Sequence, residues 1–297
     1  MTDQKSPRGS VDVAFVGRAN IDLTAQVPRR ATPGRTTFAT SLTASPGGKS
    51  LNQTIAAARR GGRCCLIANV GADSWGHQIA AALADAGVDT RHLTLLPEAT
   101  TGAAIIEVTP DGESYITLAL SPATELTADD IQHASDAIDA QAFVVQLDLP
   151  PEPVTALLRR RPAPIIIGNL VPHPDLDKAL LRHLDVLVVN QHEAAAILHT
   201  TNDDPLTAAA ELRQLGPRIV VITAGAHGAA YADSRGSGRV PAPPVPVVDT
   251  TGAGDAFLGS LALDLARRVP LSDAITTAVH VGSAAVQHAG AQRSTIG

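Results

Sequence analysis

Aromatic residues and basic runs are scarce in this chain of 297 residues. Phenylalanine, tyrosine and tryptophan together make up 2% of it, which is too few for a platform that stacks nucleic-acid bases. The net charge is -6 and no long basic run occurs, which argues against a protein that neutralises phosphate backbones. We therefore expect no nucleic-acid partner.

Long apolar runs and cysteines are also few. No stretch approaches the roughly 18 apolar residues that cross a membrane, and the polar start "MTDQKSPRGS" lacks the apolar centre of a secretory signal. The two cysteines, Cys64 and Cys65, are adjacent, and neighbours rarely meet the geometry of a disulfide. We expect reduced core thiols in a cytoplasmic protein, with residues 1–10 as a flexible tail.

What the chain does have is an alternation of short apolar strands and helices. Runs such as "VDVAFVG", "RCCLIANVG", "AFVVQLD", "VLVVN" and "RIVVITAG" are separated by helical stretches. Continuously apolar strands predict an α/β fold with a central, mostly parallel sheet that helices flank on both faces. Ligands of such sheets bind at the carboxyl ends of the strands, where this chain places Asn20, Asp22, Asp148, Asn169, Asn190 and Thr223.

Two segments, residues 23–46 and 93–120, break the alternation. They contain short β-like pieces, and Asp111-Gly112 between two apolar runs is a hairpin signal. We expect these segments to form a small β lid over the site, within one domain that spans residues 11–297.

The end of "TASPGGKS", at Gly48-Lys49-Ser50, looks like the end of a phosphate-binding P-loop. A P-loop needs a glycine at the position of Thr43 and a buried strand before it, and the preceding "TTFATSLTA" alternates like a half-exposed strand. Both requirements fail, so Lys49 has another role or is a solvated surface lysine.

The strongest motif lies between residues 247 and 268. Phe257, Leu261 and Leu265 recur at helical spacing, so a helix follows Gly252-Ala253-Gly254. Backbone N–H groups and the helix dipole make such an entrance an anion site. A dinucleotide fingerprint would need its third glycine at Phe257, whereas Asp255 could also be a simple helix-capping acid.

Two separated signatures resemble those of the ribokinase-like (PfkB-type) carbohydrate kinases. "DTTGAGDAF" is similar to the C-terminal signature of that family and "GGKSLNQTIAAARRGG" to its glycine-rich N-terminal signature. "GRANIDL", "VGADSWG", "VVNQHEAA", "VITAGAHGA" and "GAQRS" fall in family-like order. The resemblance covers residues 11–297 and implies the ribokinase-like fold and ATP-dependent phosphorylation of a sugar.

The resemblance also implies roles for single residues. Asp255 would be the general base, and the N–H groups of Gly252, Ala253 and Gly254 would stabilise charge on the transferring phosphoryl group. The sugar would be bound by Asn20, Asp22, Gly48, Lys49, Asn52 and Asp148. ATP would lie against Asn190, Thr223, Gly225, Gly228 and, near the adenine, His280.

Metal sites are implied in the same way. Asn190 and Glu193 match an Asn-x-x-Glu element that holds Mg²⁺ largely through water, which suits the preference of Mg²⁺ for few protein ligands. A K⁺ site is implied around Asp249, Thr251, Gly290 and Ser294. The family often forms homodimers through the lid, and we expect the same here.

Two departures from the family pattern leave the acceptor open. Ser50 replaces the usual glycine after the signature lysine, where it restricts the turn or adds a hydroxyl to the pocket. Asp148 stands where ribokinases place a glutamate. A free sugar, with D-ribose the first candidate, fits an acid- and amide-lined pocket best. A nucleoside would need Phe38 or Tyr115 as a platform, and a sugar phosphate would need a clamp from Arg18, Arg29, Arg30 or Arg35. A silent sugar-binding protein on the same fold is the non-enzyme alternative.

Overall fold

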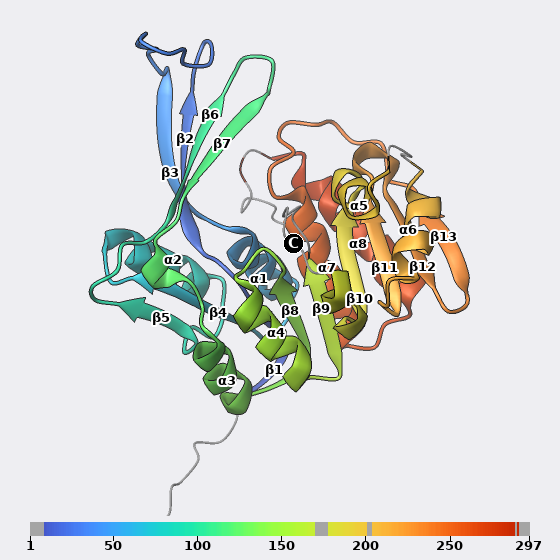
Figure 1. The fold of residues 1–297 in the computed structure, drawn as a ribbon. Coiled ribbons are helices and arrows are strands. Elements are labelled where there is room, and N and C mark those ends of the chain that lie inside the picture. Colours follow the sequence, from blue (N-terminus) through green and yellow to red (C-terminus); the bar gives the residue numbers. More distant parts are fainter. Residues whose placement is uncertain (1–8, 170–177, 201–203, 289, 291–297) are drawn as a thin grey trace, which may run out of the picture.

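The computed structural model describes residues 9–169, 178–200, 204–288 and 290. In this part of the chain a nine-stranded sheet has the order β13-β12-β11-β10-β9-β8-β1-β4-β5 (Figure 1). Its strands are β1 Gly9–Val16, β4 Cys64–Gly71, β5 Leu93–Leu96, β8 Ile138–Gln146, β9 Ile165–Asn169, β10 Val186–Asn190, β11 Ile219–Thr223, β12 Ala229–Asp233 and β13 Gly236–Val240. Only the β11–β12 and β12–β13 pairs are antiparallel, so the prediction of a mostly parallel sheet is confirmed.

Helices cover both faces of this sheet, because alternate strand residues feed two separate cores. The core on one face contains Phe15 together with residues of four helices, α1, α2, α7 and α8. The core on the other face contains Ala14 and Val16 together with residues of α3, α4, α5 and α6. The helices are α1 Lys49–Arg59, α2 Ser74–Asp85, α3 Ala128–Ala137, α4 Pro151–Arg160, α5 Gln191–Leu198, α6 Pro205–Arg213, α7 Ala253–Ala266 and α8 Leu271–Ala285. Short 3-10 turns occupy Pro122–Thr124, Lys178–His183 and Gly225–His227.

The two cysteines follow the same alternation. Cys64 belongs to the core on one face and Cys65 to the core on the other. Both are buried and free, as the sequence predicts, because neighbours in a strand point to opposite faces.

A second sheet of four strands projects from the body of the molecule (Figure 1). Its order is β3-β2-β6-β7, formed by β3 Ser41–Gly47, β2 Asn20–Gln26, β6 Ala103–Val108 and β7 Ser114–Ala119. The β6–β7 connection is a hairpin in which Gly112 adopts φ 85°, a conformation that glycine supplies without steric strain. A second small sheet is thus confirmed.

Two expected boundaries need correction. Residues 93–96 do not belong to the small sheet: they form β5, which pairs in parallel with β4 after the crossover through α2. The apolar run "LTLL" therefore lies at the edge of the large sheet. Strand β1 begins at Gly9, so Gly9 and Ser10 belong to the large sheet, whereas residues 1–8 lie outside the described residues.

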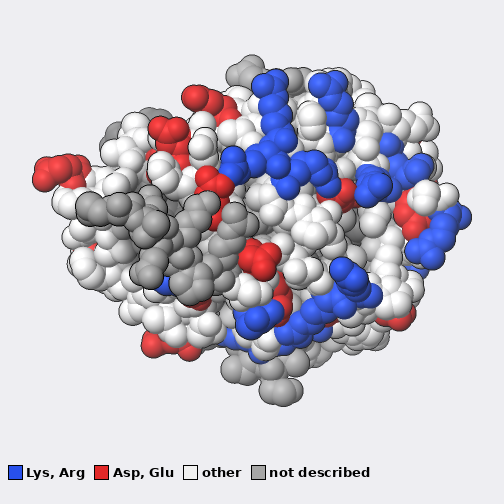
Figure 2. All heavy atoms as spheres, turned by 90° about the horizontal axis from the view of Figure 1, so that it is seen from below, with Lys and Arg blue, Asp and Glu red and all other residues white. Residues whose placement is uncertain are grey.

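Lys and Arg side chains gather on the face seen from below in Figure 2. Two nearly buried carboxylates at the amino ends of the strands pair with arginines: Asp185 binds Arg161 and Arg218, and Asp12 binds Arg63 and, at the end of α7, Arg267. These pairs join strand starts to one another and partly neutralise this edge. The polar residues expected in the site lie at the opposite, carboxyl ends.

In the described ranges, no helix is long and apolar enough to span a membrane.

Replacing Asp73 by alanine is expected to lower the free energy of unfolding by about 1–2 kcal/mol. Its carboxylate caps α2 through the N–H of Gly76 (2.9 Å) and also accepts from the N–H and hydroxyl of Thr101 (2.8 and 2.7 Å). Partial burial raises the pKa of Asp73, but these hydrogen bonds outweigh burial and hold it below its usual value.

Urea denaturation between pH 3 and 8 checks this prediction. Because the folded pKa is depressed, the contribution is present above the unfolded pKa, about 4, and is lost as the pH falls through the folded pKa. Asp85→Ala, at the exposed other end of α2, is the matched control and should change stability by less than about 0.5 kcal/mol. Equal effects of the two variants would refute the capping role.

Candidate active site

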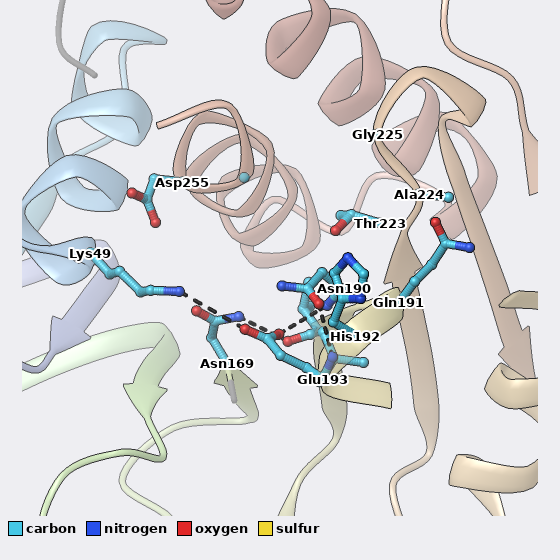
Figure 3. A pocket seen from close by; sticks show the side chains of 13 residues that line it. Lys49, Asn169, Asn190, Gln191, His192, Glu193, Thr223, Ala224, Gly225 and Asp255 are labelled. Atoms are coloured by element: carbon cyan, nitrogen blue, oxygen red, sulfur yellow. Dashed lines mark hydrogen bonds and ion pairs between the residues drawn. The ribbon is translucent and has the colours of Figure 1, made fainter. Parts of the chain in front are cut away.

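A cavity of about 430 Å³ opens at the carboxyl ends of β9, β10 and β11 (Figure 3). Its wall brings together seven residues that the sequence singled out from five separate segments: Lys49, Asn169, Asn190, Glu193, Thr223, Gly225 and Asp255. Gly254, which the sequence also singled out, is an eighth. Parallel strands end at the same edge, so residues far apart in the sequence meet there.

Helix α7, whose first turn lines the cavity, begins without a side-chain cap. Its N-cap Gly252 is left-handed, with φ 78°, and no side chain caps the helix. From Ala256 to Ala266 the helix is buried, so its entrance is held rigidly. An uncapped N-terminus at a cavity presents backbone N–H groups and the positive end of the dipole to a ligand.

Asp255 lies in the first turn of α7 and is partly buried. Its Oδ1 accepts a hydrogen bond from Gln53 Nε2 at 2.9 Å, and its Oδ2 accepts one from Asn52 Nδ2 at 3.3 Å. Loss of hydration raises the pKa of Asp255 to about 6, although these two amides and the charge of Lys49 lower it. A carboxylate with a pKa near neutrality is suited to accept a proton.

Lys49 is the first residue of α1, a helix with no acidic residue in its first turn and no side-chain cap. A cation there opposes the helix dipole, and such local conflicts are typical of functional residues. Its side chain extends toward Glu193, with Nζ 4.0 Å from Oε1 (Figure 3). Lys49 therefore lies between Asp255 and Glu193, as a cation among carboxylates.

Glu193 and Asn190 form a capping box at the start of α5. Glu193 Oε2 accepts from the Asn190 N–H at 2.9 Å, and Asn190 Oδ1 accepts from the Glu193 N–H at 2.9 Å. Burial raises the pKa of Glu193, since its side chain is only 5% exposed. Both residues lie at the cavity, and Glu193 Oε1 is the oxygen that faces Lys49.

The residues expected at the acceptor lie where the small sheet joins the body. Asn20 Nδ2 donates to Asp22 Oδ1 at 2.7 Å on β2, and burial raises the pKa of Asp22 although this bond lowers it. Gly48 has φ 96°, and a Cβ there would lie 2.9 Å from Asn20 Oδ1, so a side chain would disturb Asn20. Asn52 connects this group to Asp255.

Asp148 is held by a neighbour that the sequence did not single out as its partner. Arg18 donates to Asp148 Oδ2 at 3.0 Å, and it makes a bidentate pair with Glu125 at 2.7 and 2.9 Å. The guanidinium charge is therefore balanced by two carboxylates. The departure at Ser50 adds no hydroxyl to the cavity, because Ser50 is buried and its Oγ donates to the carbonyl of Val16 at 3.3 Å.

The remaining expected ligands differ in their placement. Asp249 accepts from the N–H groups of Thr251 (2.9 Å) and Gly290 (2.8 Å), so three of the four residues expected at K⁺ meet; Ser294 lies outside the described residues. Gly228 does not line the cavity, and its Cβ would lie 2.0 Å from the Val240 carbonyl, a packing reason for glycine. His280 is exposed on α8, with Nδ1 2.8 Å from the Thr276 carbonyl, and does not line the cavity either.

Four polar residues at the cavity or behind Asp255 escaped sequence reasoning. Gln191 and His192 line the cavity beside Asn190, and Gln53 and Gln146 form hydrogen bonds behind Asp255. Gln53 follows Asn52 directly, and Gln146 closes the apolar run "AFVVQ", so polar residues at these buried positions were the available signal.

Comparisons with known proteins agree on one family. The model of the pfkB family of carbohydrate kinases matches residues 11–296. The chain is 32% identical over 290 residues to the ribokinase of Staphylococcus aureus, covering 95% of both chains. It is 31% identical over 292 residues to a bifunctional ribokinase/ribose-5-phosphate isomerase A of Fructilactobacillus sanfranciscensis, of which it spans only 54%.

Solved structures agree in fold. The ribokinase of Thermotoga maritima superposes with a TM-score of 0.86 at 25% identity, covering 96% of this chain and 95% of that one. The ribokinase of Arabidopsis thaliana, solved with ribose and ATP, gives a TM-score of 0.83 at 25% identity over 96% of both chains. The chain belongs to the pfkB family of carbohydrate kinases, has the ribokinase-like fold, and is a phosphotransferase with an alcohol group as acceptor.

Proposed function

We propose that this protein transfers the γ-phosphate of ATP to a hydroxyl of a free sugar, with D-ribose as the first candidate. The observation that carries the proposal is Asp255: a carboxylate with a pKa of about 6 beside the uncapped start of α7, at the mouth of the cavity. Ribokinases are the relatives at about 30% identity, and the Arabidopsis thaliana one was solved with ribose and ATP.

In the proposed reaction Asp255 accepts the proton of the attacking hydroxyl. The N–H groups of the turn at Gly252, Ala253 and Gly254 stabilise the charge on the transferring phosphoryl group, as the dipole of α7 does. Lys49 balances the charge of the nearby carboxylates and contacts the acceptor or the phosphate. Asn20, Asp22 and Asn52 hold the sugar hydroxyls, for which amides and carboxylates are suitable partners.

The donor set at the cavity fits a sparsely held Mg²⁺. In the residues that the structure describes, no group of three His, Cys, Asp or Glu side chains could hold a metal ion alone. Glu193, whose carboxyl is desolvated and meets Lys49 only at 4.0 Å, would hold Mg²⁺ with Asn190 through water, next to ATP phosphates. When bound, Mg²⁺ supplies charge neutralisation at the phosphates. Asp249, Thr251 and Gly290 are the proposed K⁺ ligands.

The surroundings of the acceptor favour a free sugar over the other two acceptors. Arg18 is balanced by Glu125 and Asp148, which weakens it as a clamp for a sugar phosphate. Tyr115 is covered by the guanidinium of Arg30, 4.5 Å from its ring centroid, which weakens it as a platform for a nucleobase. Phe38 is 83% exposed in the connection between β2 and β3.

We propose further that the small sheet closes over the sugar and joins two copies of the chain. Asp22 lies on one of its strands, so movement of the sheet would move a sugar ligand. Large apolar side chains are exposed on this sheet and its connections: Phe38, Leu42, Ile105, Ile116, Leu118 and Leu120. The strand register places Leu42 and Ile105 on one face of the sheet and Ile116 and Leu118 on the other, so apolar side chains are exposed on both faces and could serve as interaction surfaces. Sedimentation equilibrium, with Leu42→Ser and Ile116→Ser as disrupting changes, tests the dimer.

A panel of acceptors tests the function. ADP release is measured with ribose, deoxyribose, hexoses, ribose 5-phosphate and nucleosides, with Mg²⁺ and with or without K⁺. The expected result is turnover with a free pentose, with kcat/KM at least about tenfold above that for any nucleoside or sugar phosphate. Turnover confined to nucleosides would reassign the acceptor, and binding of ATP and sugar without turnover would favour the silent binder.

A further inference from the structure

Gln53 is the central member of a hydrogen-bond network behind Asp255. The residue is 1% exposed, and its Nε2 donates to Asp255 Oδ1 at 2.9 Å and, at 3.4 Å, to Asn169 Oδ1. Its Oε1 accepts from Gln146 Nε2 at 2.8 Å. The network thus joins α1, α7, β8 and β9 at the point where the reacting carboxylate lies.

The direction of these hydrogen bonds follows from Asp255. An ionised carboxylate only accepts, so Gln53 must point its amide NH₂ toward it and its carbonyl toward Gln146. Gln146 then donates to Gln53, which leaves its own Oε1 buried; among the described residues that oxygen has no partner. Buried acceptors without partners are unfavourable and rare. Gln146 Oε1 is such an acceptor. In the part of the chain that the structure describes, it lacks a partner because Gln146 donates to Gln53, and that hydrogen bond keeps the NH₂ of Gln53 directed at Asp255.

We propose that Gln53, held in place by Gln146, is a positioning residue that fixes the orientation of the Asp255 carboxylate and keeps it ionised. This inference rests on the proposed role of Asp255 as the base. The short bond to Oδ1 fixes the plane of the carboxylate. Oδ2, whose hydrogen bond within the described part of the chain is the longer 3.3 Å contact to Asn52, is the oxygen that takes the proton from the acceptor.

The charges around Asp255 explain why a donor is needed there. Lys49, from α1, favours the ionised form, whereas Asp22, from β2, and the lost hydration oppose it. Glu193, from α5, adds a further negative charge whose own pKa is raised in part by Asp255. Gln53 is the strongest of the groups that lower the pKa of Asp255, so its removal shifts that pKa upward.

Gln53→Met and Gln53→Glu test the proposal through the pH profile of kcat. Methionine fills the same volume without a donor; glutamate still accepts from Gln146 but places a carboxyl against Asp255. For Gln53→Met we expect kcat about tenfold to a hundredfold lower and the acid limb about one pH unit higher, with the sugar KM within about twofold. Gln53→Glu should move the acid limb further upward.

Gln146→Met provides a second, indirect test, because Gln146 acts only through Gln53. It should shift the acid limb in the same direction by less, and the double variant Gln53→Met/Gln146→Met should be no worse than Gln53→Met alone. Thr54→Val is the matched control: Thr54 is buried beside Gln53 and its hydroxyl bonds the Ser50 carbonyl, not Asp255. Its pH profile should equal that of the unmodified protein.

The outcomes separate this inference from the proposed function. An unchanged acid limb in both Gln53 variants, with kcat lowered or not, overturns the positioning role while Asp255 remains the base. Full additivity of the Gln53 and Gln146 effects also overturns it. If Asp255→Asn itself retains more than about a tenth of the activity, the role of Asp255 as the base in the proposed function fails first, and the positioning role fails with it.

Discussion

Asp255→Asn is expected to lower kcat by about a hundredfold to ten-thousandfold, the contribution of a well-placed general base. The amide is nearly the same size as the carboxylate, and its one oxygen can still accept the short hydrogen bond from Gln53, while its NH₂ replaces the oxygen of the longer contact with Asn52. The side chain should therefore stay in place and substrate binding should persist. The loss should therefore fall on kcat and leave the KM of the sugar within about threefold.

The role of Asp255 as a base also predicts the direction in which kcat changes with pH. Asp255 acts only when ionised, and its pKa is about 6, so kcat of the unmodified protein should rise with pH through about 6 and then level off. The residual activity of Asp255→Asn should show no such limb. Initial rates between pH 4.5 and 8.5 measure both curves; a variant that retains more than about a tenth of the activity, or the same acid limb, would exclude Asp255 as the base.

Stability supplies an internal control for this variant. Because the folded pKa of Asp255 is raised, the folded state loses stability as the pH rises from the unfolded value, about 4, through about 6. An amide carries no such penalty. Asp255→Asn should therefore melt no lower than the unmodified protein at pH 8, so lost activity cannot be attributed to unfolding.

The parts of this site that could be predicted from sequence are those that lie at the ends of strands. Asn169, Asn190 and Thr223 close apolar runs, and parallel strands necessarily end at one edge, so their meeting at the cavity follows from the pattern. The small sheet was also predictable, since β-like segments interrupted the alternation. The assignment of residues 93–96 failed because a run as short as Leu-Thr-Leu-Leu suits an edge strand of either sheet.

Contacts across the fold could not be predicted in this way. Gln53 and Gln146 are 93 positions apart, and Arg18 and Asp148 are 130 apart, so no local periodicity reports that they meet. Nor could the sequence show that Ser50 turns into the core while Lys49 next to it reaches the cavity. Helical geometry sends neighbouring side chains in different directions, and only the packed helix α1 decides which one is buried.

The second large effect on kcat is expected from substitutions of Gly254. Packing does not require a glycine at this position. It lies in the first turn of α7, its φ is not positive, and a Cβ built there meets nothing within 4 Å. Glycine inside a helix is less favourable than alanine by about 0.5–1 kcal/mol. Because Gly254 lies on the wall of the cavity, the space beside its Cα is open to a ligand and is not filled by other protein atoms.

Gly254→Ala should therefore raise the free energy of unfolding by about 0.5–1 kcal/mol, and Gly254→Val should leave the fold intact. Both side chains would occupy the space in which we propose that the phosphoryl group meets the N–H groups of α7. We expect kcat to fall by about tenfold for alanine and by more than about a hundredfold for valine, since each lost or displaced donor is worth a large factor in rate.

Gly87→Ala is the contrasting control for this pair. A Cβ there also meets nothing within 4 Å, but Gly87 has φ 74° and lies at the end of α2 outside the cavity. That variant should lose stability and keep its kcat, the reverse of the Gly254 result. Chemical denaturation and initial rates on the same preparations measure both quantities. If Gly254→Val turned over at the normal rate, the phosphoryl group would have to lie elsewhere than at the start of α7, and the anion site assigned to Gly252, Ala253 and Gly254 would be wrong.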